Sequence, residues 1–303
     1  MTIDMVQHQS KTTERHLRQI ADMLILNGTL TECPGLVHGK TGIAIFFFHY
    51  AQYTDNMLFA DYAINLIGEI QNQIHVNSPA DYEKGIAGIG VGINYLIQNN
   101  FLDADSQIFE DFDDRMYRAV MYDPWQDFSL YDGLTGYGRY WISQLRYQTT
   151  SLQARECLLR IVGLIEERYS DILDNEQSDV YCFLLDLSSN YTNLHELFGF
   201  DVGARHALSL LKQCRRELDF QPKDLTRCFS RLGDSLTGNI ARIVQRNRYL
   251  NVPLQDEIDA ALKQIPDLDK PPSGMGLLTG YAGEGMLRLT AINQTDLSWM
   301  KLL

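Results

Sequence analysis

The stretch KGIAGIGVGINYL, from Lys84 to Leu96, decides the fold because it recurs along the chain in recognisable copies. Each full copy sets two glycines three residues apart at the start of an apolar run. Glycines at positions i and i+3 lie on one face of a helix, where they let another backbone approach closely. The other copies are HGKTGIAIFFF from His38, DGLTGYGRYWI from Asp132, TGYAGEGMLRL from Thr279 and the weaker TGNIARIV from Thr237.

The spacing of the copies predicts six repeats. The first glycine of each copy marks its position, and we take Gly238 as the first and only motif glycine of the weaker copy. The markers are Gly39, Gly85, Gly133, Gly238 and Gly280, spaced by 46, 48, 105 and 42 residues. The long gap is close to two repeats. It predicts a copy without glycine near residue 185, in Asp179–Ser188, while a second register, GFDVG at Gly199, fits the spacing less well.

Amphipathic segments lie between the glycine motifs. Apolar residues follow a helical period from Phe59 to Ile74, from Ala154 to Ile165 and from Leu17 to Leu24. Each unit therefore predicts a helical hairpin, in which a nearly all-apolar inner helix opened by Gly-x-x-Gly is followed by an outer helix with one wet face. Alternating buried and half-buried helices predict an all-α fold: an α/α toroid of about six hairpins, forming a single domain over residues 1–303.

Composition narrows the function classes. The 303 residues carry 26 Lys and Arg against 39 Asp and Glu, a net charge of −13 that repels phosphate backbones and anionic lipid. We therefore expect no nucleic-acid partner. No apolar stretch has the length of a signal peptide core or a membrane span, so we expect a cytoplasmic protein without membrane insertion. The five cysteines contain no C-x-x-C pair, which argues against a disulfide framework and favours buried thiols.

The ordered motifs resemble the lanthionine synthetase C-like (LanC-like) family. GLVHGKTGIAIF, YEKGIAGIGVGINYL, LYDGLTGYGRYWI and GLLTGYAGEGMLRL carry the resemblance, which spans roughly residues 33–290. It implies an α/α toroid with a central cavity. In active members of the family that cavity holds a zinc ion, which activates a peptide cysteine thiolate for addition to a dehydrated serine or threonine.

The sequence departs from the family at its catalytic positions. The family's zinc ligands stand in W-C-x-G and C-H-G motifs, but this chain has Ser235-Leu236-Thr237-Gly238 where either is expected, and it has no Cys-His dipeptide. The family's acid/base aspartate falls on Ser129, with Asp132 three residues later. The histidine of the H-G-I-P-G motif falls on Val202 in the GFDVG register. His38 is kept, in a place that the resemblance makes structural or cavity-lining. We therefore expect no zinc cofactor and leave enzymatic activity open.

Polar residues at the starts of the inner helices form the candidate site. Helix caps and solvated charges account for many such residues. As a site they predict an acidic, tyrosine-rich cavity mouth that binds a peptide or a sugar-like small molecule. The weak catalytic candidates are Asp132, Glu83 and His38. The whole set is His38, Lys40, Asp81, Tyr82, Glu83, Lys84, Tyr131, Asp132, Asp234, Thr237, Tyr281 and Glu284.

Three functions follow from these observations. The first is a LanC-like protein of peptide maturation that lacks zinc-dependent cyclase activity and acts as a peptide-binding protein or scaffold. The second is an active peptide cyclase with non-standard zinc ligands, drawn from Cys33, His38, Cys182 or Cys228. The third is a carbohydrate-active enzyme of six-hairpin architecture, which would need two carboxylates, such as Glu83 and Asp132, about 5 to 10 Å apart across the cavity.

Overall fold

The described residues of the chain fold into helices. The computed structural model describes residues 3–75, 77–103, 109–147, 151–190, 209–210, 212, 229–250, 253–265, 268 and 272–303. No strand occurs among them, and a single bridge joins Gly274 to Gly280. The predicted all-α class is confirmed. The α-helices are α1 (Ile3–Gly28), α2 (Lys40–Thr54), α3 (Met57–Gln73), α4 (Ile86–Gln98), α5 (Glu110–Met121), α6 (Leu134–Tyr147), α7 (Leu152–Glu167), α8 (Asp174–Asn190), α12 (Leu236–Leu250), α13 (Gln255–Lys263) and α14 (Tyr281–Ala291).

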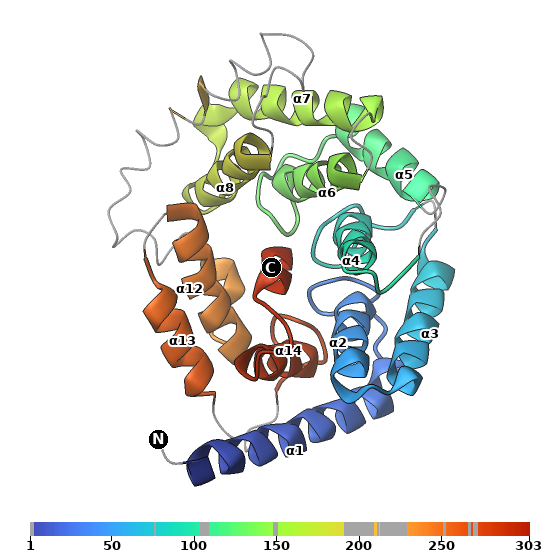
Figure 1. The fold of residues 1–303 in the computed structure, drawn as a ribbon. Helices are drawn as coiled ribbons and strands as arrows, with labels where there is room; N and C mark the ends of the chain where they lie inside the picture. The colour runs from blue at the N-terminus through green and yellow to red at the C-terminus, as the bar shows by residue number, and fades with distance from the viewer. Residues whose placement is uncertain are drawn as a thin grey trace. The chain divides into compact units, whose positions relative to one another are not determined.

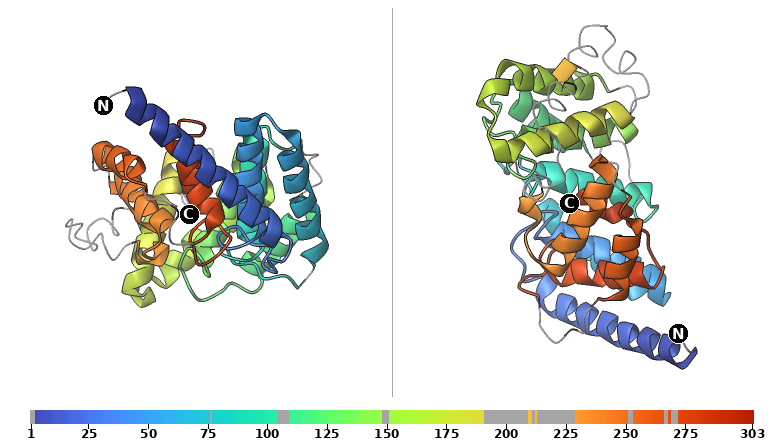
Figure 2. Two further views of the ribbon diagram at one scale, coloured as in Figure 1. Left: turned by 90° about the horizontal axis from the view of Figure 1, so that it is seen from below. Right: turned by 90° about the vertical axis from the view of Figure 1, so that its left-hand side faces the viewer.

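The helices form two compact units. The terminal unit combines both ends of the chain, Met1–His75 and Arg231–Leu303, and the central unit is Val76–Ser230. In the terminal unit α2 packs against α3, α14 against α2, and α1 crosses α14 (Figures 1 and 2). In the central unit α4 packs against α5 and α6, and α6 packs against α7 and α8 (Figure 1). No helix in the described residues is long and apolar enough to cross a membrane.

From α1 to α7, helices that are buried along almost their whole length alternate with helices that have one exposed face. We call the helices that follow the glycine motifs inner helices and the others outer helices. In α2 every residue from Lys40 to Ala51 is buried. The outer helices bury one stripe each, because only residues three or four apart face the inner helix. The buried stripes are Ala60, Ala63, Leu66, Ile67 and Ile70 in α3, Ala154, Cys157, Leu158, Ile161, Val162, Leu164 and Ile165 in α7, and Leu17, Ile20, Ala21 and Leu24 in α1.

The first glycine of each full motif is the last residue before an inner helix. Gly39, Gly85 and Gly280 are extended N-caps, and a Cβ on Gly39 would collide with the carbonyl oxygen of Cys33. The amide that follows the glycine donates to the carbonyl seven residues earlier. This bond is 2.9 Å from Lys40 N to Cys33 O, and it recurs before α4, α6 and α14. The loop thus supplies a partner for an amide at the helix start, where donors lack intrahelical acceptors.

Three of the copies have a third glycine two residues after the second, and an aromatic ring from another inner helix packs against it. A Cβ on Gly90 of α4 would strike the ring of Tyr140 in α6. Gly138 of α6 meets Phe183 of α8 in the same way, and Gly285 of α14 meets Phe46 of α2. Each glycine costs its helix about 1 kcal/mol relative to alanine, which the close ring contact offsets.

The loops before the inner helices are joined by a matching pair of hydrogen bonds. Tyr82 N and Glu83 N donate to Tyr131 O at 2.8 and 3.2 Å in the central unit. Leu277 N and Leu278 N donate to Val37 O at 2.9 and 3.1 Å in the terminal unit. The last inner helix, α14, therefore docks on the first, α2, through the contacts that join α4 to α6.

The weak fifth copy stands in a different register from the one predicted. Helix α12 begins at Leu236, so Ser235 takes the place of the first glycine. A Cβ on Gly238 would collide with Leu232 O, as a Cβ on the second glycine Gly42 would with Leu36 O. Gly238 is thus the second glycine, and the prediction that it is the first is wrong. Ser235 Oγ accepts from Gly238 N at 3.0 Å, which is how serine caps a helix.

The glycine-free fourth copy is helix α8, which covers the predicted segment Asp179–Ser188. In other copies, the aromatic residue that packs against a neighbouring glycine lies seven residues after the first glycine, as Tyr140 does after Gly133. Phe183 packs against Gly138 in the same way, so Glu176 stands at the position of the first glycine. Its carboxylate accepts from Leu173 N at 3.2 Å. Asp179 Oδ2 accepts from Leu130 N at 2.9 Å, where the other loops use a backbone carbonyl. The alternative register at Gly199, with Val202, lies outside the described residues.

Candidate functional site

The predicted mouth residues lie in both units. We call the loops before the inner helices the rim loops, which are residues 33–39, 79–85, 127–133, 229–235 and 274–280. The terminal unit carries His38, Lys40, Asp234, Thr237, Tyr281 and Glu284. The central unit carries Asp81, Tyr82, Glu83, Lys84, Tyr131 and Asp132.

In the central unit the rim loops bring four carboxylates together. This acidic loop cluster consists of Asp81, Glu83, Asp127 and Asp132. Partial burial raises the pKa of Asp132 above its ordinary value, and the charges of Glu83, Asp81 and Asp127 raise it further. The positive charge of Lys84 lowers the pKa of Asp132. Because carboxylates raise one another's pKa only at close range, the cluster carries a concentrated negative charge.

Two members of the acidic loop cluster also have structural roles. Asp81 Oδ1 accepts from Lys84 N at 2.7 Å and from Gly85 N at 3.2 Å, so it caps α4. Asp127 Oδ1 accepts from Ser129 N at 2.5 Å, which fixes the loop before α6. Glu83 Oε2 lies 3.3 Å from Lys84 Nζ in an ion pair whose lysine is exposed and whose glutamate is half-buried. The exposed Asp132 is therefore the member best placed to meet a ligand, and the half-buried Glu83, whose charge acts on Asp132, is the second candidate contact.

A buried tyrosine stands beside the cluster. Burial raises the pKa of Tyr137, in the first turn of α6, to about 12, with a smaller contribution from Asp81 and an opposing one from Arg115. Its hydroxyl is therefore protonated at neutral pH and remains a hydrogen-bond donor.

In the terminal unit His38 pairs with the neighbouring rim loop. Thr279 Oγ1 lies 3.4 Å from His38 Nδ1, and each residue directly precedes a first glycine. Tyr281 opens α14 and is buried, and burial raises its pKa. Burial also raises the pKa of Glu284, one turn farther on, against the effect of Arg288 at 3.6 Å. His38, Tyr281 and Glu284 thus belong to one end of the α14–α2 pair.

Lys40 and Asp234 do not join that group. Lys40 Nζ lies 2.6 Å from Glu69 Oε2 of α3, so the buried lysine points toward its own outer helix. The side chain of Asp234 is 99% exposed and lies 3.7 Å from Arg242 of α12. Thr237 is buried in the first turn of α12, where its Oγ1 lies against Gly283. These positions are those of packing and surface residues.

Within the described residues, the donors do not fit the zinc site that the resemblance implies. Leu236 is the first residue of α12, so the place of a cysteine ligand holds an aliphatic side chain. Within the part of the chain that the structure describes, no three His, Cys, Asp or Glu side chains are grouped to hold a metal ion. Cys157 and Cys182 are buried in helices of the central unit. Cys214 and Cys228, like His195 and His206, lie outside the described residues.

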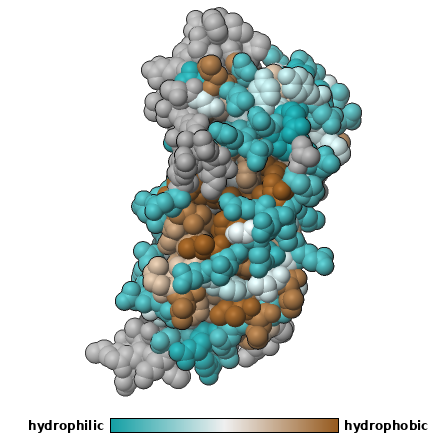
Figure 3. All heavy atoms as spheres, turned by 90° about the vertical axis from the view of Figure 1, so that its right-hand side faces the viewer, coloured by the Kyte–Doolittle hydropathy of each residue, from teal (hydrophilic) through white to brown (hydrophobic). Residues whose placement is uncertain are grey.

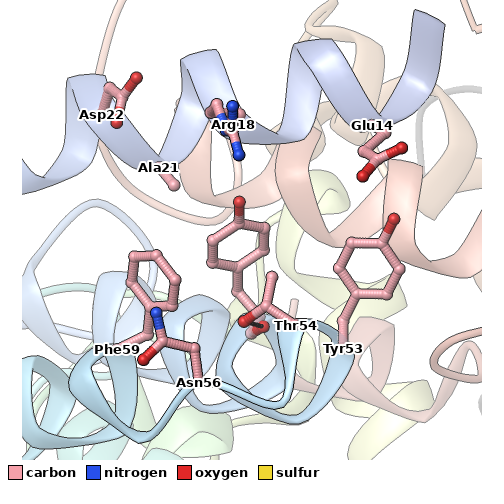
Figure 4. Close-up of a pocket in the computed structure, with 9 residues that line it drawn as sticks. Glu14, Arg18, Ala21, Asp22, Tyr53, Thr54, Asn56 and Phe59 are labelled. Atoms are coloured by element: carbon pink, nitrogen blue, oxygen red, sulfur yellow. Dashed lines mark hydrogen bonds between the residues drawn. The ribbon is translucent and has the colours of Figure 1, made fainter. Parts of the chain in front are cut away.

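A groove that sequence reasoning missed lies in the terminal unit between α1 and the α2–α3 corner (Figure 4). Its volume is about 500 Å³, within the range of small-molecule sites. Its walls are charged on α1 and aromatic or polar on the corner. The lining residues are Glu14, Arg18, Ala21, Asp22, Tyr50, Tyr53, Thr54, Asn56 and Phe59. The helical spacing of Glu14, Arg18 and Asp22 predicts a shared face, but nothing local predicts what that face meets.

Among the described residues, we identify no site of comparable size formed by exposed apolar side chains. On the face drawn in Figure 3 they lie in patches separated by hydrophilic residues. Met57 and Leu58, each 71% exposed, are among the most exposed large apolar residues that the structure describes. Single exposed apolar residues are normal on a protein surface. The acidic loop cluster and the α1 groove are thus the two candidate sites.

Comparison with known proteins gives no further indication of a site. No protein-family model matches the chain, and no curated protein matches it.

Proposed function

We propose that this protein is a LanC-like peptide-binding protein of peptide maturation that does not catalyse the zinc-dependent cyclisation. In this proposal its inner helices close into one α/α toroid, with the rim loops at the mouth of a central cavity. The repeated docking supports this architecture, since α14 meets α2 through the contacts that join α4 to α6. The lack of fitting zinc donors at Leu236 supports the absence of the cyclase reaction.

The acidic loop cluster carries the proposal of peptide binding. Its carboxylates are close enough to raise the pKa of Asp132, so a bound cation would relieve their mutual repulsion. Lysine and arginine side chains of a peptide are such cations, and each donates several hydrogen bonds. The predicted ligand is therefore a peptide with a positively charged segment, bound with Glu83 and Asp132 as its main contacts.

The test is a binding measurement with two labelled peptides of equal length, one rich in lysine and one rich in glutamate. Fluorescence anisotropy should detect the lysine-rich peptide only. Asp132→Asn and Glu83→Gln should each weaken its binding about two- to fivefold, the range for partly exposed charge pairs. Binding should also weaken as salt is raised, because exposed charges are screened.

The matched control is Asp111→Asn, which removes an exposed carboxylate from α5 of the same unit, outside the cluster. This variant should bind the lysine-rich peptide like the original chain. Equal weakening by Asp111→Asn would reduce the effect to overall charge and reject the site. Equal binding of both peptides would reject the proposed ligand class.

Elemental analysis of the purified chain without a histidine tag tests the proposal that the protein lacks the zinc-dependent cyclase reaction. We expect no stoichiometric zinc after dialysis in chelator-free buffer. About one zinc per chain would show a set of ligands that the sequence motifs do not predict, and it would restore the peptide cyclase as the leading function.

A carbohydrate-active enzyme is the second candidate, because Glu83 raises the pKa of Asp132 and such pairs divide acid and base roles in glycosidases. This function predicts hydrolysis of a glycoside that Asp132→Asn and Glu83→Gln both abolish. Peptide binding without any glycoside hydrolysis would favour the first proposal.

A further inference from the structure

The α1 wall of the groove presents charges at regular spacing. Glu14, Arg18 and Asp22 are successive i+4 positions of one helix, so they share a face and lie ~6 Å apart along the axis. All three side chains are exposed. Figure 4 shows Glu14 pointing across the groove toward Tyr53. This wall therefore carries two negative groups, Glu14 and Asp22, with the positive Arg18 between them.

The opposite wall matches that spacing. The ring centroids of Tyr50 and Tyr53 are 6.1 Å apart at the end of α2. Burial raises the pKa of Tyr53 and Glu14 raises it further, whereas Arg18 opposes the rise that burial causes in Tyr50. Glu14 is thus the charged side chain that acts on Tyr53, and Arg18 is the one that acts most strongly on Tyr50, where Asp22 and Glu14 have smaller effects of the opposite sign. One pair can accept from a cation and the other can donate to an anion.

The polar groups of the groove are available to a ligand. Tyr50 is 5% exposed, yet its hydroxyl hydrogen-bonds to no group in the described residues and is not sealed from solvent. Tyr53, Glu14 and Arg18 likewise make no hydrogen bond or ion pair there. Asn56 differs, since its Oδ1 accepts from Leu58 N at 3.1 Å as the cap of α3. A buried tyrosine facing open space with an unused hydroxyl indicates a binding site rather than packing.

We propose that this groove binds a small zwitterion of the amino-acid type. Its ammonium lies between Glu14 and Tyr53, and its carboxylate lies between Arg18 and Tyr50. Its apolar side chain packs on Phe59, which lies opposite Ala21 beyond the charged pairs (Figure 4). Phe59 and Tyr50 already form an aromatic corner, with ring centroids 4.7 Å apart. The site uses no rim loop, so it stands independently of the proposed peptide binding.

The groove is large enough for an aromatic amino acid or a dipeptide, as its volume of about 500 Å³ exceeds what a single charged group requires. A ligand with only one charge would pair with either Glu14 or Arg18 and would leave the other side chain without an opposite charge. We therefore expect the zwitterion to be preferred over both of its singly charged analogues.

The test compares three probes that share one side chain: L-phenylalanine, phenethylamine, which lacks the carboxylate, and 3-phenylpropionate, which lacks the ammonium. Calorimetry on the full chain should show L-phenylalanine binding about tenfold or more tightly than either analogue, the effect of one hydrogen-bonded charge. Arg18→Gln should weaken L-phenylalanine to the level of phenethylamine. Glu14→Gln should weaken it to the level of 3-phenylpropionate.

The matched control is Asp61→Asn, an exposed carboxylate of α3 that does not line the groove. It should leave the affinity for L-phenylalanine unchanged, and thermal melts should show all three variants folded. Tyr50→Phe removes only the unused hydroxyl and should weaken carboxylate-bearing probes alone. Absence of L-phenylalanine binding, or equal affinity for phenethylamine, would overturn the proposal.

Discussion

Gly285 of α14 faces the ring of Phe46 of α2 so closely that a Cβ on the glycine would overlap the ring. The same relationship joins α4 to α6 and α6 to α8. The contact that joins α14 to α2, two helices far apart in the sequence, is thus of the same kind as the contacts between successive inner helices of the central unit.

Gly285→Ala should therefore destabilise the protein by about 1–3 kcal/mol, the usual effect of overpacking a tight contact. Gly68→Ala is the matched substitution in the same unit, because a Cβ there meets nothing within 4 Å. It should raise the free energy of unfolding by about 0.4–1 kcal/mol. Urea denaturation measures both, and similar effects of the two substitutions would contradict the packing argument.

Ser235 should behave as a cap that replaces a glycine. Its Oγ accepts from Gly238 N at 3.0 Å and donates to Leu278 O at 2.6 Å. Ser235→Ala should lower the free energy of unfolding by about 1–2 kcal/mol, because it removes the cap and leaves a loop carbonyl without this donor. Ser235→Gly should cost less, since glycine is tolerated at this position in the other copies. If the alanine variant were as stable as the original chain, the revised register would lose its energetic support.

Asp113 should make the central unit more stable in mild acid. Burial raises its pKa to about 6, and Tyr140 Oη donates to its Oδ1 at 2.6 Å. The folded state keeps the proton up to about pH 6, whereas the unfolded chain releases it near pH 3.8. The stabilisation is therefore complete below the unfolded value and is lost as the pH rises through about 6.

Asp113→Asn removes this titration. Relative to the original chain, the variant should gain on the order of 1–2 kcal/mol between pH 4 and pH 7, after allowance for partial exposure. Urea melts at several pH values provide the measurement. A stability difference that stays constant over this range would show that Asp113 does not titrate as its burial implies.

His49 should make the terminal unit less stable in acid. Burial lowers its pKa to about 4, against a smaller raising effect of Asp296. The unfolded chain takes up this proton near pH 6.5, so the stabilisation is complete above that value and declines as the pH falls through about 4. His49→Gln should lose less stability on acidification than the original chain, by on the order of 2 kcal/mol. Parallel acid profiles of the two proteins would disprove this role.

The sequence predicts the inner helices well wherever glycine itself is needed. Gly39, Gly85 and Gly280 each stand directly before a helix, as expected, because a Cβ would meet the loop that folds back on them. The prediction fails at Ser235 and misses Glu176, because capping side chains perform there the task that glycine performs elsewhere. A search for repeated glycines does not recognise such substitutes.

The candidate site is predicted less completely. The position of the acidic loop cluster before the inner helices follows from the repeat, so Asp81, Glu83 and Asp132 are found. Asp127 is missed because it lies six residues before the first glycine, Gly133. The direction of Lys40 depends on Glu69, an acid from the next helix. The α1 groove depends on how α1 packs against the rest of the terminal unit, and local sequence patterns do not predict such long-range packing.

The junction of α14 with α2 also sets an order for biosynthesis. The ribosome makes α1, α2 and α3 before the helix that covers Phe46, because that helix begins only at Tyr281. The central unit is continuous in sequence and has its partners at hand much earlier. Nascent chains should therefore expose the apolar surface of α2 until α14 has been synthesised, and during that interval chaperones can bind this surface.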